Sequence, residues 1–177
     1  MTDNNRYFMK SGRLGFRHWS RSLLPEAIDL WGDTKVTKLI SVGGFSRAEI
    51  ENRLSKEVDL GKSLGVQYWP IFLLDNDNFA GCCGFHPESG NTIVLELGYH
   101  LLPEYWGKGL AREAAACCIA WARDTLKTRE IKAGHHPQNA PSGKVLIKLG
   151  FRQIEDEYYP PTGLMHPTYS LLLNPEH

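Results

Sequence analysis

The sequence predicts one α/β domain, of the α+β kind in which a mostly antiparallel sheet is combined with helices. Three observations lead to this fold class. The chain has 177 residues, 42% of them hydrophobic and 11% aromatic, which is enough for one well-buried core but short for two. Segments of strand character and segments of helical periodicity follow one another along it. No repeat, low-complexity tract or linker divides residues 1–177.

A strand and two helices are expected first, at residues 14–19, 23–31 and 46–60. The second helix has the clearest boundaries. Ser46 and Glu49 fit a capping box, in which each side chain binds the backbone N–H of the other residue. An apolar stripe follows at helical spacing, and Gly61 suits the helix end because glycine readily adopts the left-handed conformation found there.

Three strands of an antiparallel meander come next, at residues 68–74, 79–86 and 92–101. Clusters of turn-forming residues separate them. The second half of the chain alternates helices and strands. Its expected elements are an amphipathic helix at 110–126, a strand at 130–136, a short helix capped by Asn139 or Ala140 with Pro141 as its first residue, and strands at 152–158 and 168–173.

Charge and hydropathy exclude several classes of function. Twenty basic and twenty acidic residues cancel, so no overall field attracts nucleic acid or an anionic membrane. Residues 1–6 are polar and lack the apolar core of a signal peptide, and the longest apolar run, 114–122, is too short to span a bilayer. We therefore expect a cytoplasmic protein with no nucleic-acid and no membrane partner.

The four cysteines occur as two adjacent pairs, Cys82–Cys83 and Cys117–Cys118. Neighbours in a strand point to opposite faces, so Cys82 and Cys83 cannot readily hold one ion together, and the chain has no Cys-x-x-Cys spacing. We expect reduced core cysteines and no metal site.

The most informative segment is residues 105–111, Tyr-Trp-Gly-Lys-Gly-Leu-Ala, which we call the glycine turn. It follows a predicted strand and opens a predicted helix. Two glycines let the backbone approach a ligand, and the free N–H groups and positive dipole end of the helix favour an anion. The turn therefore predicts a pyrophosphate cradle, with a tight connection as the alternative. Arg112 stands where a dinucleotide-binding Gly-x-Gly-x-x-Gly needs its third glycine, and no P-loop pattern occurs.

The preceding strand extends this segment into a longer motif. Residues 96–114 read Glu-Leu-Gly-Tyr-His-Leu-Leu-Pro-Glu-Tyr-Trp-Gly-Lys-Gly-Leu-Ala-Arg-Glu-Ala, and Asn-x-x-Ser at 139–142 and Lys-Leu-Gly-Phe at 148–151 follow. Together these motifs resemble the GNAT acetyltransferase superfamily, and within it the Rim-type ribosomal-protein N-terminal acetyltransferases. The resemblance covers about residues 12–173. It implies a single GNAT-like domain with a mixed, mostly antiparallel central sheet splayed in the middle, helices on both faces, and acetyl-coenzyme A (acetyl-CoA) as donor.

The resemblance also implies which residues bind the coenzyme. The pyrophosphate would lie on backbone N–H groups of the glycine turn, where Lys108 either adds charge or is simply solvated. The pantetheine arm would run beside the strand end near Tyr99, where a backbone N–H polarises the thioester carbonyl. Asn139 would bind the pantetheine amides, cap its helix, or do both. The residues expected at the coenzyme are Tyr99, Leu101, Trp106, Gly107, Lys108, Gly109, Leu110, Ala111, Asn139 and Ser142.

Glu96 is the residue that we expect to act as general base. An acceptor amine arrives as an ammonium ion and must lose a proton before it attacks, and a carboxylate can remove that proton directly or through a water. Glu96 lies between Leu95 and Leu97 in a strand expected to be central, where burial raises the pKa of a carboxyl group. The alternative is a structural carboxylate paired with an arginine or a histidine.

Ser142 is the candidate acid for the departing thiolate, a role that the resembled subgroup suggests. A free thiol titrates near about 8.5, so it needs little help, and Ser142 would otherwise bind coenzyme or first-turn N–H groups. His86, His135 and His136 are candidates for the acceptor pocket, against ordinary core or surface histidines. Leu146 stands where many superfamily members carry a tyrosine acid, so that mechanism does not carry over.

The sequence thus predicts an acetyl-CoA-dependent N-acetyltransferase in which a primary amine attacks directly, since no cysteine has a convincing nucleophile setting. The acceptor is a protein N-terminus or a small-molecule amine, because fold and donor do not decide between them. The alternative from another class is a non-catalytic acyl-CoA-binding sensor or interaction domain, against which the presence of Glu96 argues. Acyl-chain preference and oligomeric state, including a homodimer, stay open.

Overall fold

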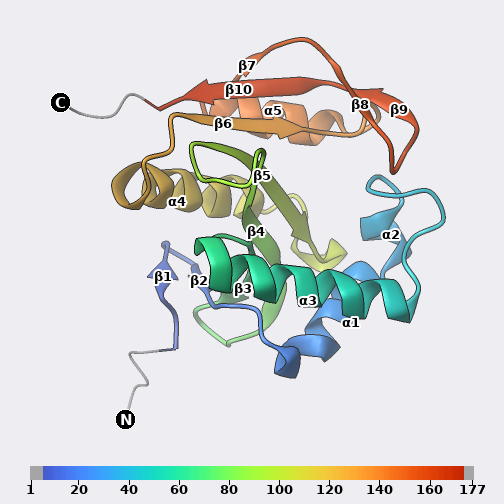
Figure 1. Ribbon diagram of the computed structural model, residues 1–177. Helices are drawn as coiled ribbons and strands as arrows, with labels where there is room; N and C mark the ends of the chain where they lie inside the picture. The colour runs from blue at the N-terminus through green and yellow to red at the C-terminus, as the bar shows by residue number, and fades with distance from the viewer. Residues whose placement is uncertain (1–5, 174–177) are drawn as a thin grey trace.

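An eight-stranded sheet forms the centre of the computed structural model, which describes residues 6–173 (Figure 1). Its strands lie in the order β1-β2-β3-β4-β5-β6-β10-β7. They are β1 (Met9–Lys10), β2 (Leu14–Phe16), β3 (Tyr68–Leu73), β4 (Phe79–Pro87), β5 (Val94–Leu101), β6 (Glu130–Gly134), β7 (Arg152–Gln153) and β10 (Thr168–Leu172). A separate ribbon pairs β8 (Glu157–Tyr159) with β9 (Leu164–His166). The helical elements are η1 (Arg21–Leu23), α1 (Leu24–Trp31), α2 (Thr34–Thr37), α3 (Arg47–Leu64), η2 (Pro103–Tyr105), α4 (Leu110–Thr125) and α5 (Ala140–Lys148).

The sheet is splayed between β5 and β6. These strands are parallel, whereas the other neighbouring pairs of the sheet are antiparallel. Only residues 94–96 of β5 pair with 130–132 of β6, while the rest of β5 bonds to β4 alone. In Figure 1 β6 and β10 accordingly lie above β5, and β4 and β3 lie below it. The predicted mixed, splayed sheet is confirmed.

Helices cover both faces of the sheet, as predicted. On one face α4 packs Ala114 and Cys118 against the central strands. On the other face α1 and α3 contribute Trp31 and Leu54 to a second core. Within residues 6–173 no helix has both the length and the apolar character needed to cross a membrane.

The adjacent cysteines of β4 point to opposite faces of the sheet, as strand geometry predicts. Cys82 belongs to the core under α1 and α3, and its neighbour Cys83 belongs to the core under α4. All four cysteines are free thiols. The prediction of core cysteines is confirmed for Cys82, Cys83 and Cys118, whereas Cys117 is only partly buried and packs against the edge of the core under α4.

Helix α3 begins as predicted but ends later. The capping box is present: Ser46 Oγ accepts the Glu49 N–H (3.3 Å) and Glu49 Oε2 accepts the Ser46 N–H (2.7 Å). The predicted end at Gly61 is wrong, because α3 runs on and Gly65 closes it with a φ of 72°. A glycine is required at position 61 for a steric reason, because a Cβ atom there would lie 2.3 Å from the amide nitrogen of Gln67.

Other predicted boundaries also shift. The first strand ends at Phe16, and β6 ends at Gly134, so the two histidines after it lie outside the sheet. The segment predicted as one strand at 152–158 divides into β7 and the start of β8, which leaves the main sheet. Pro141 is the second residue of α5. The elements α2, β1 and β9 were not predicted, because each spans at most four residues and pattern reasoning needs longer windows.

Candidate active site

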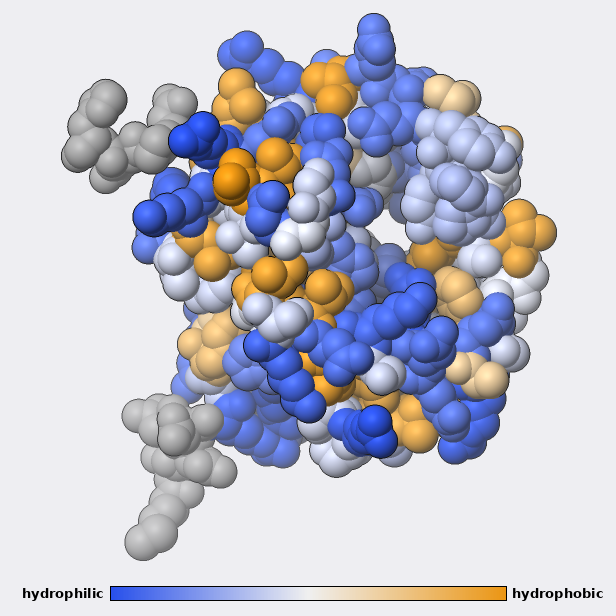
Figure 2. Space-filling view, viewed as in Figure 1, coloured by the Kyte–Doolittle hydropathy of each residue, from blue (hydrophilic) through white to orange (hydrophobic). Residues whose placement is uncertain are grey.

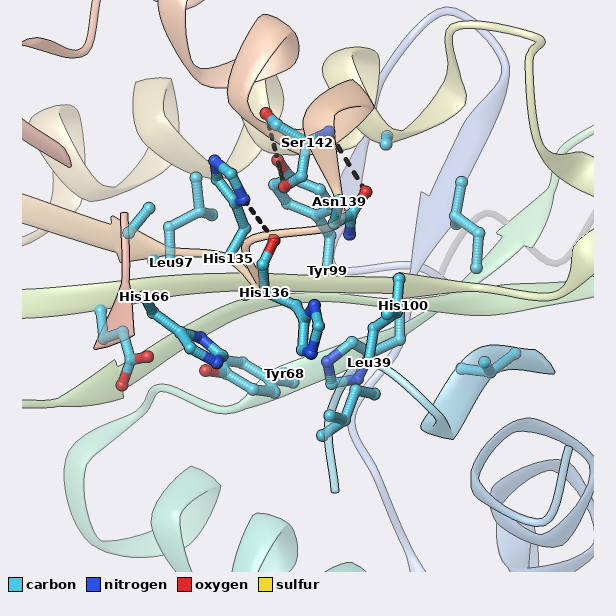
Figure 3. Close-up of a pocket in the computed structure, with 18 of the residues that line it drawn as sticks. Leu39, Tyr68, Leu97, Tyr99, His100, His135, His136, Asn139, Ser142 and His166 are labelled. Atoms are coloured by element: carbon cyan, nitrogen blue, oxygen red, sulfur yellow. Dashed lines mark hydrogen bonds between the residues drawn. The ribbon is translucent and has the colours of Figure 1, made fainter. Parts of the chain in front are cut away.

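The splay between β5 and β6 opens into a cavity of about 1290 Å³. Its walls come from α2, α3, β4, β5, the glycine turn, α5 and the β8–β9 ribbon (Figure 3). Across its mouth the Val42 N–H donates to the carbonyl of Pro161 (3.1 Å), which joins the loop before α3 to the ribbon. Ile40 and Tyr159, beside these two residues, line the cavity. Figure 2 shows the opening to the right of the centre.

The glycine turn presents free backbone N–H groups. Gly107 and Gly109 have left-handed φ angles of 73° and 76°. A Cβ atom at Gly107 would meet nothing within 4 Å, so a ligand can approach the backbone there. The Glu113 N–H donates to the carbonyl of Gly109 (3.1 Å), and the N–H groups of residues 107–112 have no acceptor in the described chain. Lying at the positive end of α4, a helix of 16 residues, they fit a pyrophosphate.

Side chains hold the glycine turn in place. Glu113 accepts hydrogen bonds from the Ser11 hydroxyl, the Arg13 backbone N–H and Arg13 Nε, each at 2.7 Å. Arg13 Nη1 also donates to the carbonyl of Lys108 (3.1 Å). Burial raises the pKa of Glu113, but these hydrogen bonds outweigh that effect and leave the pKa below its usual value. The turn is therefore fastened to the β1–β2 connection without help from a ligand.

The structure gathers the predicted coenzyme residues, with one exception. Trp106 Nε1 donates to the carbonyl of Leu101 (2.8 Å), which holds the turn against the end of β5. The ammonium of Lys108 lies over the Tyr105 ring, 5.5 Å from its centroid, and outside the cavity wall, which favours the solvated alternative. The predicted coenzyme residues that line the cavity are Tyr99, Leu101, Trp106, Gly107, Gly109, Leu110, Ala111, Asn139 and Ser142.

The side chain of Tyr99 joins β5 to α5 across the splay. Its hydroxyl lies 2.8 Å from Ser142 Oγ, and Asn139 Oδ1 accepts the Ser142 N–H (3.4 Å) (Figure 3). Burial raises the pKa of Tyr99 to about 12, so the phenol stays protonated at neutral pH. Sequence reasoning placed Tyr99 at the coenzyme through its backbone alone. The direction of the Tyr99 side chain was predictable from strand alternation, because residues three apart in a strand, such as Glu96 and Tyr99, point to opposite faces of the sheet.

Glu96 projects into the cavity from the face of β5 that α1 and α3 cover. Its carboxylate is open to solvent through the cavity, but the surrounding walls bury it from most sides, and this burial raises its pKa. His86, its neighbour on β4, lowers this pKa, whereas Glu157 and Glu88 raise it. No cation within residues 6–173 forms an ion pair with Glu96, because Lys132 of β6 binds Glu88 instead (2.6 Å). Glu96 is thus not a paired structural carboxylate.

A buried carboxylate holds His86 beside Glu96. His86 Nε2 donates to Glu57 Oε1 (2.7 Å), and the ring stacks on Tyr68 with centroids 3.7 Å apart. Glu57 is only 2% exposed, and its second oxygen accepts the Tyr68 N–H (2.9 Å). Glu57 was not predicted to belong to the site. Its one signal in the sequence is a carboxylate beside the apolar stripe of α3.

The two adjacent histidines follow the end of β6 and have different surroundings. His135 is buried, with Nδ1 donating to the carbonyl of His136 (2.8 Å) and Nε2 accepting from the Tyr169 hydroxyl (3.4 Å). His136 faces the cavity, where its ring centroid lies 5.6 Å from that of His166 (Figure 3). Among the described residues, no group of three or more His, Cys, Asp or Glu side chains could hold a metal ion. His135 and His136 both line the cavity, so both remain candidates for acceptor contact, and hydrogen bonds to protein atoms fix the ring of His135.

Comparison with known proteins agrees with this geometry. Residues 13–152 match the acetyltransferase (GNAT) domain family. The chain belongs to this family. It is 30% identical over 124 residues to the uncharacterised N-acetyltransferase p20 of Bacillus licheniformis, covering 70% of each chain. It is 31% identical over 102 residues to the ribosomal protein uS5-alanine N-acetyltransferase of Escherichia coli, covering 57% of this chain and 53% of the other.

Solved structures show the same fold. A GNAT-family acetyltransferase from Bacillus anthracis superposes with a TM-score of 0.78 at 25% identity, covering 93% of this chain and 97% of the other. RimL, a ribosomal L7/L12 alpha-N-protein acetyltransferase solved with coenzyme A, gives 0.77 at 18% identity, covering 94% and 97%. The second likeness is one of fold alone.

Family membership confirms several predictions. The protein is an acetyl-CoA-dependent N-acetyltransferase, and the resemblance to the Rim-type group is borne out by its relatives. The free N–H groups of the glycine turn fit the donor that the family uses. The departure at Leu146 is also visible, since this residue is buried in the core with 1% exposure and presents no hydroxyl to the cavity.

Proposed function

We propose that the protein acetylates a primary amine by direct attack and that Glu96 removes the proton from the acceptor ammonium. The observation that carries this proposal is a carboxylate without a counter-ion on the wall of the acetyl-transfer cavity. Burial raises its pKa, and a base with a raised pKa takes a proton from an ammonium ion more readily. His86, held by Glu57, is the cross-strand neighbour of Glu96 and lowers its pKa against the larger effect of burial.

The opposite wall serves the leaving group in this proposal. Tyr99 and Ser142 form one hydrogen-bonded hydroxyl pair, which donates a proton to the departing thiolate or orients a water that does so. The backbone N–H groups of residues 107–111 bind the pyrophosphate, and Asn139 both caps α5 and contacts the pantetheine arm. Base and acid therefore face the thioester from opposite faces of β5.

The thiols support direct attack over a covalent cysteine intermediate. None of the four cysteines lines the cavity. Burial raises the pKa of Cys82 and of Cys118 well above the usual value and that of Cys117 to about 11, so these thiols stay protonated and are poor nucleophiles.

The acceptor belongs to one of two kinds in this proposal, a protein N-terminus or a small-molecule amine. The name of the E. coli relative, ribosomal protein uS5-alanine N-acetyltransferase, favours the first. A homodimer is compatible with either acceptor and is open to test by light scattering.

The decisive experiment compares Glu96→Gln with the wild-type enzyme on a panel of amines and N-terminal peptides. Loss of a general base is expected to lower turnover about 10²- to 10⁴-fold while coenzyme A affinity, measured by calorimetry, is unchanged. Glu51→Gln is the matched control, since Glu51 pairs with Arg47 on the exposed side of α3. A Glu96→Gln enzyme that keeps more than about a tenth of wild-type turnover would falsify the assignment of the base.

A further inference from the structure

Arg53 of α3 lines the cavity with a charge that the described chain does not neutralise. Its Nε atom is buried and donates to no acceptor. Among residues 6–173 no carboxylate forms an ion pair with its guanidinium group. Leaving a buried donor of a charged group without an acceptor is unfavourable, so the arrangement suggests a partner that arrives with the substrate.

Suitable carboxylates are present one helical turn to either side, and both are occupied. Glu49 precedes Arg53 by four residues and gives Oε2 to the N–H of Ser46 (2.7 Å). Glu57 follows it by four residues and binds His86 (2.7 Å) and the N–H of Tyr68 (2.9 Å). Carboxylates at this spacing are the usual partners of an arginine on a helix. Arg53 therefore lacks a partner because its neighbours are held elsewhere.

Two aromatic rings hold the guanidinium group. Its central carbon lies 5.1 Å from the ring centroid of Trp31 and 5.0 Å from that of Phe45. The N–H groups of a guanidinium lie in its plane, so contact with rings through its face leaves them free for a planar or tetrahedral oxyanion. The charge of Arg53 also acts on another residue of the cavity wall. Burial raises the pKa of Tyr159, and Arg53 opposes this effect.

Charges of both signs line the cavity, and those without a partner are separated. Arg53 lies with the exposed lysines Lys35 of α2, Lys38 just after it and Lys56 of α3, and the two carboxylates on this wall, Glu49 and Glu57, are held by the bonds described above. Glu96 lies with Glu88 and Glu157, which raise its pKa, but Lys132 pairs with Glu88 (2.6 Å) and Glu157 (4.0 Å), so Glu96 is the carboxylate left without a counter-ion. Tyr159 lines the same cavity as Arg53 and Glu96. A ligand that matches this cavity carries a cation at one end and an anion at the other.

We propose that the acetyl acceptor is a small amine that also carries an oxyanion, a carboxylate or a phosphate, and that Arg53 binds this oxyanion while the amine faces Glu96. Arginine suits both anions because its fork of N–H groups forms paired hydrogen bonds with either. The proposal rests on the amine acetylation proposed above and goes further by naming the acceptor class and the residue that selects it. A peptide N-terminus without a nearby acidic group leaves Arg53 unpaired.

Matched acceptors test the proposal. One pair is an α-amino acid and its amide, the other is phosphoethanolamine and ethanolamine, and a neutral amidated peptide is the third arm. Turnover is followed by thiol release with wild type, Arg53→Gln and Arg53→Lys. The control is Arg47→Gln, on the same helix but outside the cavity with a side chain that is 71% exposed.

The wild-type enzyme is expected to prefer the anionic member of at least one pair by about tenfold or more in kcat/KM. The pair that shows the preference tells a carboxylate from a phosphate. Arg53→Gln should raise KM for that acceptor about tenfold or more, leave kcat within about twofold, and leave the neutral member unchanged. The KM of Arg53→Lys should lie between those of the wild type and Arg53→Gln. Arg53→Lys replaces Arg53→Gln in the test if the glutamine variant does not fold. Arg47→Gln should behave as wild type.

Failure of this inference is distinct from failure of the proposed function. Equal use of both members, preference for the neutral peptide, or an equal loss on both members in Arg53→Gln overturns the role of Arg53 while acetylation stands. If no amine is turned over, calorimetric titration of the same pairs onto the coenzyme A complex decides. Tighter binding of the anionic member that Arg53→Gln abolishes supports the inference, and equal or absent binding of the two members refutes it.

Discussion

Breaking the hydrogen bond between Tyr99 and Ser142 is expected to reduce both stability and turnover. The bond is 2.8 Å long and ties β5 to α5 where β5 and β6 no longer pair. A buried hydroxyl that loses its partner costs about 1–3 kcal/mol, and a neutral hydrogen bond contributes about 0.5–1.5 kcal/mol. Tyr99→Phe and Ser142→Ala should therefore each lower the free energy of unfolding by about 1–2 kcal/mol, and the double variant by about 1 kcal/mol less than their sum.

The effect on turnover follows from the leaving group. A thiol of pKa near about 8.5 leaves mostly without help above that pH and needs a proton donor below it. We expect Ser142→Ala to lower kcat about tenfold at pH 7 and much less at pH 9. The tenfold loss is smaller than is usual for a general acid because the thiolate needs little help in leaving. Tyr99→Phe should act in the same direction, since the Tyr99 hydroxyl positions Ser142, and the double variant should be no slower than Ser142→Ala.

Urea denaturation measures the first effect and thiol release at the two pH values measures the second. Ser170→Ala is the control, because Ser170 donates to Glu130 (2.6 Å) away from the cavity and should lose stability without losing turnover. Two results would refute the reasoning: additive losses of stability in the double variant, or a deficit in kcat that is the same at both pH values.

Two further perturbations test the glycine turn and His100, a partly buried histidine of β5. Gly107→Ala and Gly90→Ala place the same strain on left-handed residues with φ of 73° and 71°, so each should cost about 1–2 kcal/mol of stability, but only Gly107→Ala should weaken coenzyme A binding in calorimetry. Equal affinities in the two variants would remove the turn from the coenzyme site. Burial, followed by Arg53 and His86, lowers the pKa of His100 to about 3, while an unfolded histidine titrates near about 6.5. The free energy of unfolding should therefore decrease as the pH falls from the unfolded pKa of His100 towards its folded pKa, by up to about 1.4 kcal/mol per pH unit. His100→Asn should reduce this pH dependence, measured as the difference between urea denaturation at pH 7 and at pH 5. An unchanged slope would contradict this origin.

Features set by neighbours in the chain were predictable. The capping box of Ser46 and Glu49 depends on residues three apart, and the opposite faces of Cys82 and Cys83 follow from strand geometry alone. The end of α3 was not predictable in this way. Gly61 satisfies the local rule for a helix end, but its missing side chain makes room for Gln67, which the sequence pattern does not reveal.

The candidate site divides in the same manner. The resemblance to the GNAT superfamily predicted that Glu96, the glycine turn and Ser142 belong to one site. Their partners were not foreseeable, because His86 meets Glu57 across 29 residues of chain and Tyr99 meets Ser142 across 43. The sequence did not predict a functional role for Arg53, because a helical arginine with glutamates one turn away normally forms ion pairs at the surface.

The sequence by itself predicted the kind of chemistry through its resemblance to the GNAT acetyltransferases, whereas the local physics of a glycine turn at a helix start predicts only a site for an anion. Only the tertiary structure decided which side chains are left unsatisfied. Whether Glu96 and Arg53 are paired or free depends on where Lys132 and Glu57 are bound, and those bonds exist only once distant segments pack together. Glu49, by contrast, is held by the local capping box. Electrostatic complementarity to a substrate is the part of the charge distribution that folding leaves unmatched, so it cannot be read before the fold is known.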